Sequence, residues 1–301
     1  MLNITVRHLH YLVALAETGS FSRAANRVGV TQSTLSAAIQ SLELELGAPL
    51  VDRSGRKIQM LPSGDAVVRQ ARDIIVRIQE LPEHAAEAAR PLTTRLRLGV
   101  IPSVAPFILP KILPSLTEAY PELNLSMREG LTRDLLDELR SGRLDAAIIA
   151  RPYQIDGFDC AEIGVDPFFL AIRNDHPLAK RDKVDMDDVE GERFLLLETG
   201  HCLREHVIAA VGEANARGED DVRASSIMTL VQMMEFGLGV TLLPRIAIEA
   251  GATRGTNLSV VPYVGEHNAR SLVLIWRSGA VRRHDYHLLA EHLRHHCMPA
   301  A

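Results

Sequence analysis

The sequence predicts two domains of different class, a helical domain at the N-terminus and a larger α/β domain behind it. Over residues 1–61, apolar side chains recur at helical spacing and the runs stop at glycines. From Arg95 onward, short apolar runs of strand length alternate with longer helical patterns, which is typical of helices packed on a sheet. The chain has 301 residues, which is long enough for both domains to bury a core.

Three helices are expected in the first domain. The first ends at the polar turn 18–20, where a serine can cap a second helix over residues 21–28. Gly29 can end that helix, because a left-handed backbone costs glycine little. Thr31 can cap a third helix that stops at Gly47. Two helices joined by so tight a turn predict a helix-turn-helix.

A hairpin and a long helix complete the N-terminal region. Residues 50–60 read as a short hairpin with a basic turn. Pro62 then begins a long helix, which Pro82 should end or bend. Its apolar residues are spaced 4, 3, 4, 3, which is the seam of a coiled coil; they are Val67, Ala71, Ile74, Ile78 and Leu81. The helix could pack on its own domain, but the narrow stripe between charged residues favours dimerisation.

The remaining chain alternates strands and helices. Expected strands are residues 96–101, 123–127, 146–150, 168–172, 194–197 and 271–276, and expected helices are residues 106–120, 133–141, 203–214 and 282–296. This order predicts a parallel, doubly wound sheet that binds ligands at the carboxyl ends of its strands. We expect the last helix to pack back on the first half of the domain.

Composition narrows the function classes. The formal net charge is −5, so any surface that contacts nucleic acid must be local. No basic leader with an apolar run, and no uncharged apolar run of membrane length, is present, so we expect a cytoplasmic protein. We find no Ser/His/Asp constellation, phosphate-binding loop or dinucleotide motif, so we expect neither an enzyme nor a cofactor.

The three cysteines have no paired spacing. Cys160, Cys202 and Cys297 therefore indicate neither a disulfide framework nor a zinc site. A histidine pair at residues 295–296 lacks a third ligand at suitable spacing, so no metal is expected. We expect Cys160 to be structural and Cys297 to be exposed.

The third helix has the side chains that base recognition requires. Short polar residues at its start can enter the major groove and reach base edges; they are Thr31, Gln32, Ser33 and Ser36. Arg53 and Arg56 on the hairpin can contact phosphates or the minor groove. Alone, the threonine could be only a helix cap and the arginines only solvated surface. Within a helix-turn-helix with a wing, DNA binding is the better interpretation.

The segment LHYLVALAETGSFSRAANRVGVTQSTLSAAIQSLELELGAPLVDRSGRKIQMLPSG resembles the head of LysR-type transcriptional regulators. The FSRAA turn, the VTQSTLS helix, the LE-x-x-LG helix end and the L-V-x-R wing all match, and LRLGVIPSVAPFILPKILP, GLGVTLLP and IWR extend the resemblance over the chain. It implies a winged helix-turn-helix over residues 1–61, a linker and dimerisation helix over 62–91, and a sensor domain over 92–301. The sensor would be a two-lobed, periplasmic-binding-protein-like α/β domain, with lobes at residues 92–166 with 271–301 and at 167–270.

The same resemblance implies partners. A LysR-type regulator binds double-stranded promoter or operator DNA, and RNA polymerase is an expected contact. We expect a homodimer formed through the linker helix and a homotetramer with two DNA-contacting dimers.

Within that family, LLLETGHCLREH at residues 195–206 resembles the OxyR-type peroxide sensors, which carry a reactive cysteine in a Gly-His-Cys-Leu-Arg run. The resemblance implies that Cys202 is the redox-sensing residue and that the peroxide-binding residues are Ser103, Thr132, His201, Cys202 and Arg270. One departure is evident. OxyR-type sensors have a resolving cysteine nine residues after the first, and Val211 stands there, so that disulfide cannot form.

The residues around Cys202 support a reactive thiol on physical grounds. A helix N-terminus has partial positive charge and free N–H groups, both of which favour a thiolate. Arg204 and His206 could add positive potential. We therefore expect a regulator that responds to hydrogen peroxide or oxidative stress through Cys202.

Two other functions compete with this interpretation. The sensor domain could instead bind a small organic anion between its lobes, with Ser103, Thr132 and Arg270 as ligands and Cys202 as a small buried side chain without a role. A solute-binding protein of the same architecture is disfavoured by the attached DNA-binding domain.

Overall fold

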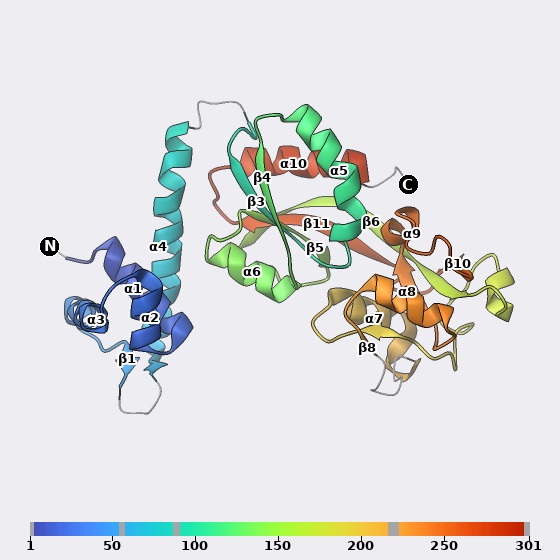
Figure 1. The fold of residues 1–301 in the computed structure, drawn as a ribbon, viewed down its shortest axis with the longest axis horizontal. Coiled ribbons are helices and arrows are strands. Elements are labelled where there is room, and N and C mark those ends of the chain that lie inside the picture. The colour runs from blue at the N-terminus through green and yellow to red at the C-terminus, as the bar shows by residue number, and fades with distance from the viewer. Residues whose placement is uncertain (1–2, 54–57, 87–90, 216–222, 298–301) are drawn as a thin grey trace. The chain divides into compact units, whose positions relative to one another are not determined.

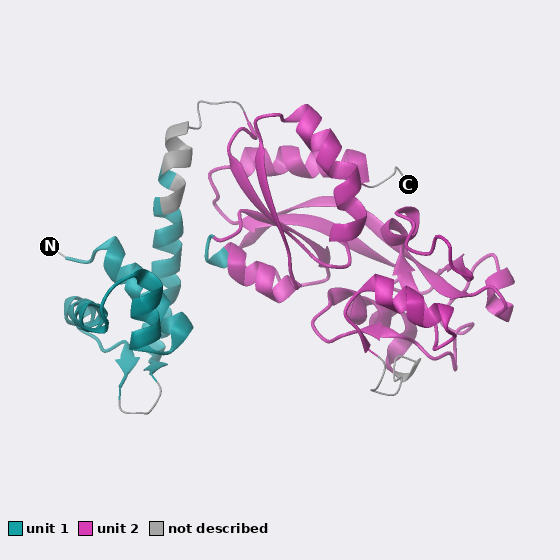
Figure 2. Ribbon diagram, in the orientation of Figure 1, with its two compact units in different colours: residues 1–88, 140–142 teal, residues 89–139, 143–301 magenta. Residues whose placement is uncertain are grey.

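The computed structural model describes residues 3–53, 58–86, 91–215 and 223–297. The chain divides into two compact units, residues 1–88 with 140–142 and residues 89–139 with 143–301 (Figure 2).

The N-terminal unit begins with the three predicted helices, α1 (Val6–Thr18), α2 (Phe21–Val28) and α3 (Gln32–Leu46). Ser20 and Thr31 cap α2 and α3 as expected, Thr5 also caps α1, and a left-handed glycine ends each helix. The helices share one apolar core, whose members include Leu12, Leu15, Ala24, Leu35, Ile39, Leu42 and Leu50. The predicted helix-turn-helix is confirmed.

The expected hairpin follows α3. β1 (Val51–Asp52) pairs antiparallel with β2 (Gln59–Met60). The carboxylate of Glu43 on α3 positions the hairpin, because its Oε1 accepts from the backbone N–H groups of Leu50 at 2.9 Å and Val51 at 3.2 Å. The glutamate of the LE-x-x-LG motif therefore joins the end of α3 to the wing.

The long helix α4 (Pro62–Ala86) differs from its prediction at its C-terminus. It does not end at Pro82 but continues for one further turn, so the proline's missing N–H disturbs only the end of the helix. Its predicted seam is divided between two environments. Ala71 is buried with Ile75 against Leu9 of α1, whereas Ile74 is 43% and Leu81 60% exposed.

The second unit contains a seven-stranded sheet in the order β10-β6-β11-β5-β3-β4, with β9 also paired to β6. Its strands are β3 (Arg95–Val100), β4 (Asn124–Glu129), β5 (Ala146–Arg151), β6 (Phe158–Arg173), β9 (Thr241–Pro244), β10 (Leu258–Pro262) and β11 (Ala269–Arg277).

The prediction of a parallel sheet is wrong for part of this unit. β3 pairs in parallel with β4 and β5, but β11 and β6 pair antiparallel to their neighbours. The reason is that β11, from the end of the chain, is inserted between β5 and β6 and runs antiparallel to both.

The long strands β6 and β11 pass through both lobes of the unit (Figure 1). One lobe carries α5 (Ala105–Ala119), α6 (Thr132–Arg140) and α10 (Arg283–Cys297). The other carries α7 (Cys202–Asn215), α8 (Ile227–Glu235), α9 (Arg245–Glu249), the 3-10 turn η1 (Pro177–Lys180) and the short parallel pair β7 (Leu196–Leu197) and β8 (Arg223–Ala224). α10 contacts α5, β6 and β11, which confirms that the last helix packs back on the first lobe.

A single apolar core runs through both lobes. It joins the inner faces of β3, β5 and β11 to α5, α7 and α8. Several polar residues of this unit are also buried, among them Ser103, Thr132, Asp166, His206 and Arg270. Over the described part of the chain, no helix combines the length and apolar character needed to cross a bilayer.

Candidate functional site

The predicted DNA-contacting side chains gather at the N-terminus of α3. Thr31, Gln32 and Ser33 are exposed there, and Ser36 is half-buried one turn later. Thr31 is the N-cap: its Oγ1 accepts from the backbone N–H of Thr34 at 3.2 Å. The same oxygen lies 2.9 Å from the Ser33 hydroxyl. Thr31 therefore orders the start of the helix, and the neighbouring side chains remain accessible.

Gln32 has a partner that sequence reasoning missed. The hydroxyl of Ser22 on α2 donates to Gln32 Oε1 at 2.7 Å. The interaction orients the side-chain amide and leaves its NH₂ group available to donate. No sequence signal identified this pair, because it depends on the angle between α2 and α3.

The two arginines of the hairpin are placed differently. Arg53 Nη2 donates to Glu43 Oε2 at 2.8 Å, and its guanidinium lies 5.6 Å from the centre of the Phe21 ring. Its side chain is thus engaged within its own domain, although a third of it stays exposed. Arg56 lies outside the described residues.

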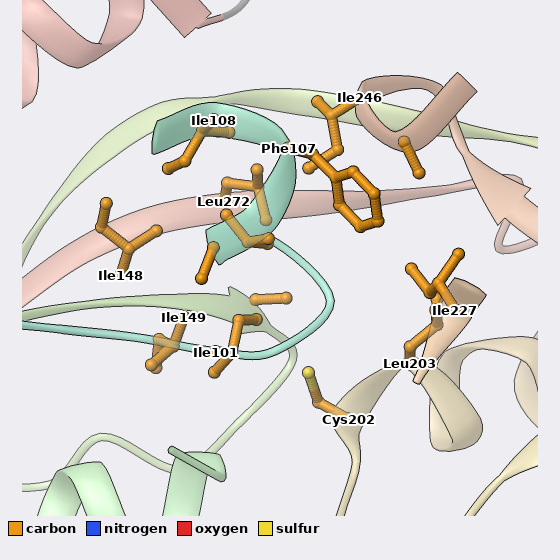
Figure 3. Close-up of a cluster of buried hydrophobic side chains, with 14 of the residues drawn as sticks. Ile101, Phe107, Ile108, Ile148, Ile149, Cys202, Leu203, Ile227, Ile246 and Leu272 are labelled. Atoms are coloured by element: carbon orange, nitrogen blue, oxygen red, sulfur yellow. The ribbon is translucent and has the colours of Figure 1, made fainter. Parts of the chain in front are cut away.

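Cys202 is the first residue of α7, one residue earlier than the predicted helix start. Figure 3 shows its side chain extending from the start of this helix toward the loop that carries Ile101. The residue is 9% exposed and borders the apolar core. The thiol therefore lies at a helix N-terminus and is largely screened from solvent, so a small ligand is the kind of reactant that can reach it.

The side chain of Arg270 on β11 is fully buried. Its Nη1 donates to the Ser103 hydroxyl at 2.7 Å, and its Nη2 donates to the Ser103 carbonyl at 3.0 Å. Ser103 follows β3 and is itself buried. Two residues that the resemblance assigned to one peroxide-binding site are thus in direct contact.

Asp166 on β6 completes this cluster and was missed. It lies opposite Arg270 in the strand register, and its Oδ2 accepts from Arg270 Nε at 3.0 Å. Its Oδ1 accepts from the backbone N–H of Ile246 at the start of α9, at 3.1 Å. Burial raises the pKa of Asp166, and the charge of Arg270 opposes that rise. The pairing of β6 with β11 was not predicted, so the sequence offered no signal for this contact.

Thr132 begins α6 and is buried at the same end of the lobe. Its Oγ1 has no hydrogen-bond partner among the described residues. The segment before Cys202 packs beside it: a side chain at Gly200 would approach Leu131 Cδ1 at 3.1 Å, and Gly200 has a φ of +103°. The backbone conformation there favours glycine, and an added side chain would also require Leu131 to shift by a few tenths of an ångström. A buried hydroxyl without a partner is suited to bind a small polar ligand.

His206 does not supply the expected positive charge, and the neighbouring His201 is not a source of positive charge either. Burial lowers the pKa of His201, and the charges of Glu198 and Glu129 partly oppose this lowering. Burial also lowers the pKa of His206. Both rings are therefore largely neutral at pH 7. Arg204 donates to the Leu197 carbonyl at 3.2 Å and holds the strand before the helix.

The environments of the other two cysteines reverse the predictions. Cys160, expected to be structural, is exposed on β6. Cys297, expected to be exposed, is buried, and burial raises the pKa of its thiol to about 12. The helix α10 carries Cys297 inward because it packs against α5. Val211 is buried in the apolar core. Within the described ranges, no three His, Cys, Asp or Glu side chains are placed to hold a metal ion.

Comparison with known protein families gives two matches that together span most of the chain. The family "Bacterial regulatory helix-turn-helix protein, lysR family" matches residues 6–65, and "LysR substrate binding domain" matches residues 89–298.

Individual proteins match over nearly the whole length. A "Hydrogen peroxide-inducible genes activator" of Dickeya chrysanthemi is 38% identical over 293 residues, covering 97% of this chain and 96% of the relative. A full-length OxyR of Pseudomonas aeruginosa with a cysteine-to-aspartate substitution matches with a TM-score of 0.75 and 32% identity. The match covers 97% of this chain and 95% of that structure. A cysteine-to-serine variant of Corynebacterium glutamicum OxyR, with hydrogen peroxide bound, matches with a TM-score of 0.66 and 31% identity. The match covers 97% of this chain and 92% of that structure.

Proposed function

Since the chain belongs to the LysR family of bacterial DNA-binding transcriptional regulators, we propose that it regulates transcription in response to hydrogen peroxide, with Cys202 as the sensing thiol. The observation that carries the proposal is the position of Cys202, buried at the start of α7. The same unit also holds buried polar groups that bind one another or lack a partner. Relatives named as peroxide-inducible activators cover the same length of chain.

The chemistry requires few groups. The thiolate sulfur attacks one peroxide oxygen, an S–O bond forms, and the O–O bond breaks. Sulfur loses two electrons to the peroxide, and the second oxygen leaves as hydroxide and becomes water with the proton from the thiol. Partial positive charge at the N-terminus of α7 favours the thiolate. Ser103 and the unpartnered hydroxyl of Thr132 would hold the peroxide by hydrogen bonds.

The charge of the cluster favours a neutral ligand over an organic anion. Arg270 is paired with Asp166, and the side chains of both are fully buried. A bound carboxylate would therefore meet no excess positive charge from this pair and would lose its own hydration. Hydrogen peroxide is small and uncharged, so it avoids this cost. The anion-binding alternative is accordingly the weaker one.

The oxidised state would differ from that of a two-cysteine sensor. Because Val211 occupies the expected position of the resolving cysteine, Cys202 would remain a sulfenic acid or form a mixed disulfide with a small thiol. Cys297 is buried in α10 and Cys160 is exposed on β6, so neither belongs to the helix that carries Cys202.

We further propose that α3 reads operator DNA and that α4 pairs two copies of the chain. Thr31, Gln32, Ser33 and Ser36 would face the bases, and Arg53 and Arg56 would contact phosphates. The exposed seam residues Ile74 and Leu81 would form the contact between copies. Two such dimers would make a tetramer, and oxidation would change the spacing or bend of the bound DNA and so the contact with RNA polymerase.

Peroxide titration of the purified protein, followed by intact mass, peptide mapping and DNA footprinting, tests the proposal. We expect one oxygen or one small-thiol adduct on Cys202 and an altered footprint. The variant Cys202→Ser should lose both, and Cys160→Ser should retain both. Reaction confined to Cys160 or Cys297, or an unchanged footprint after full oxidation of Cys202, would contradict the proposal. If an organic acid still changes the footprint of the Cys202→Ser variant, that result would support the alternative function.

A further inference from the structure

Helix α1 joins the helix-turn-helix to the long helix α4. It contacts α2, α3 and α4 (Figure 1). Its contact with the helix-turn-helix is a broad apolar core that includes Leu12, and Val68 near the start of α4 belongs to the same core. Farther along α4, the contact is a small cluster whose buried members are Leu9, Ala71 and Ile75. Apolar packing therefore holds the start of α4 firmly and the direction of the rest of the helix more weakly.

One carboxylate bridges three helices beside this small cluster. Glu17 lies in the last turn of α1. Its Oε2 pairs with Arg27 Nη2 of α2 at 2.7 Å, and its Oε1 accepts from Arg72 Nη2 of α4 at 3.3 Å. Arg72 directly follows Ala71 of the small cluster. The side chain of Glu17 is only 20% exposed, so the bridge is largely screened from solvent.

Glu17 occupies a position that is unfavourable for a carboxylate on an isolated helix. The C-terminus of a helix has partial negative charge, which repels an acidic side chain in the last turn. The last turn of α1 has no basic residue to offset this repulsion. The guanidinium groups of Arg27 and Arg72 supply the compensating charge from two other helices. Because a different helix holds each carboxylate oxygen, the bridge restricts the angle between α2 and α4.

That angle matters for DNA because two copies of the chain must fit one duplex. The half-sites that a dimer reads lie about one helical turn apart, roughly 34–36 Å, or at multiples of that distance. One additional base pair moves a half-site by about 3.4 Å and rotates it by roughly 34–36° around the duplex axis. If α4 pairs two copies and α3 reads the bases, the angle between these helices decides which spacings both copies can reach at once.

We propose that Glu17 is a positioning residue for DNA recognition. By holding Arg27 of α2 and Arg72 of α4, it sets the direction of the helix-turn-helix relative to α4 and so the half-site spacing that the protein accepts. The proposal rests on the proposed roles of α3 in reading DNA and of α4 in pairing two copies, and it is independent of the peroxide chemistry. Glu17 acts through the helices that it joins and not by contact with a base.

Selection from a random-sequence duplex library by the full-length protein tests the proposal. The enriched duplexes are sequenced, and half-site spacings are compared for the original protein, Glu17→Gln and Arg72→Gln. We expect the original protein to enrich one dominant spacing and both variants to enrich the same half-site sequence at several spacings. Asp73→Asn removes an exposed carboxylate from α4 and should leave the spacing unchanged.

Binding to defined duplexes gives the magnitude. One duplex has the dominant spacing and another has one additional base pair between its half-sites, and fluorescence anisotropy at matched salt measures both. The preference of the original protein for the first duplex should fall about threefold or more in either variant, since an exposed ion pair changes an equilibrium constant by a few-fold and a dimer contains two copies of it. The double variant should show no further loss, because both substitutions break the same contact. A duplex with a single half-site should be bound equally by all these proteins.

The outcomes separate this proposal from the functions on which it rests. If both variants keep the single spacing and the full preference, the role of Glu17 is overturned and DNA reading by α3 stands. Additive effects in the double variant, or weaker binding of the single half-site, would also overturn it. If the original protein enriches no paired half-sites, the proposed reading and pairing fail, and this proposal fails with them. Should Glu17→Gln fail to fold, Arg72→Gln alone decides by the same measurements.

Discussion

Arg270 on β11 and Ser103 after β3 are joined by two hydrogen bonds, one to the hydroxyl at 2.7 Å and one to the carbonyl at 3.0 Å, across 167 residues of sequence. Because the hydroxyl oxygen accepts from the guanidinium, its own proton remains available for another acceptor. Arg270 also pairs with Asp166, which receives the N–H of Ile246. One buried cation thereby connects β3, β6, β11 and α9, elements that belong to both lobes.

The first prediction concerns the stability of this buried pair. Asp166→Asn should lower the free energy of unfolding of the α/β unit by about 3–5 kcal/mol, because it leaves the charge of Arg270 buried without its counter-ion. Urea unfolding followed by the fluorescence of the single tryptophan, Trp276, measures this, since that residue is buried in the same unit. Asp175→Asn, which breaks the exposed pair with Arg173, is the matched control and should leave the midpoint unchanged. Equal effects of the two variants would contradict the prediction.

The second prediction concerns pH. Burial lowers the pKa of His201, His206 and His292 from the ordinary value of 6.5. The unfolded chain therefore binds protons near pH 6.5 that the folded chain does not. These histidines should make their full contribution to the free energy of unfolding above pH 6.5. The free energy should fall as the pH drops through 6.5 toward the folded pKa values.

Urea unfolding at a series of pH values between about 5 and 8 measures this slope. His206→Gln should make the dependence shallower, because one buried titrating group is removed. His284→Gln, a change at an exposed histidine, should not. A stability that rises on acidification through this range would show the sign to be wrong.

The third prediction concerns recognition of DNA. Gln32→Ala should weaken binding to the specific operator by about 1–3 kcal/mol while non-specific binding changes little, because the amide contacts base edges and not phosphates. Ser22→Ala should have a smaller effect of the same kind, since Ser22 only orients the amide. Fluorescence anisotropy with operator and scrambled duplexes at matched salt measures both. Equal losses on the two duplexes would argue against base readout.

The fourth prediction concerns assembly. Ile74→Asp should weaken self-association of the chain by more than tenfold, because it places a charge in the exposed part of the α4 seam. Sedimentation velocity over a range of concentrations detects the shift. Arg69→Asp, an exposed change outside the seam, should leave association intact. Undiminished association of the Ile74 variant would place the contact between copies elsewhere.

The helical domain could be predicted nearly residue by residue because its signals are local. Ser20, Gly29 and Thr31 act within one helical turn of their own position, so α2 and α3 begin and end where expected. The α/β domain was predicted less completely. Residues 158–167 of β6 were left unassigned, and β9 and β10 were not identified, because these strands depend on pairing with distant strands. α8 and α9 were also missed, because helices of nine and five residues carry little periodic signal.

The candidate site shows the same division. Cys202, Ser103, Thr132 and Arg270 were selected from motifs, and the structure places Arg270 directly on Ser103. Asp166 could not be selected, because a lone aspartate in an unassigned strand has no local signature. The charge state of His206 was also misjudged, since it depends on burial beneath Phe168 and beside Arg270.

The amino-acid sequence by itself determined the helix-turn-helix, the family and the thiol that a sensor would use, because caps, glycine stops and contiguous motifs act over a few residues. Only the tertiary structure decided which buried polar groups contact one another and which of them are charged. The antiparallel pairing of β6 with β11 brings Asp166 to Arg270, and the packing of α7 against β5 and β6 makes His206 a buried neutral base. Burial and partner geometry depend on residues far apart along the chain, and these are the properties that set a side chain's charge.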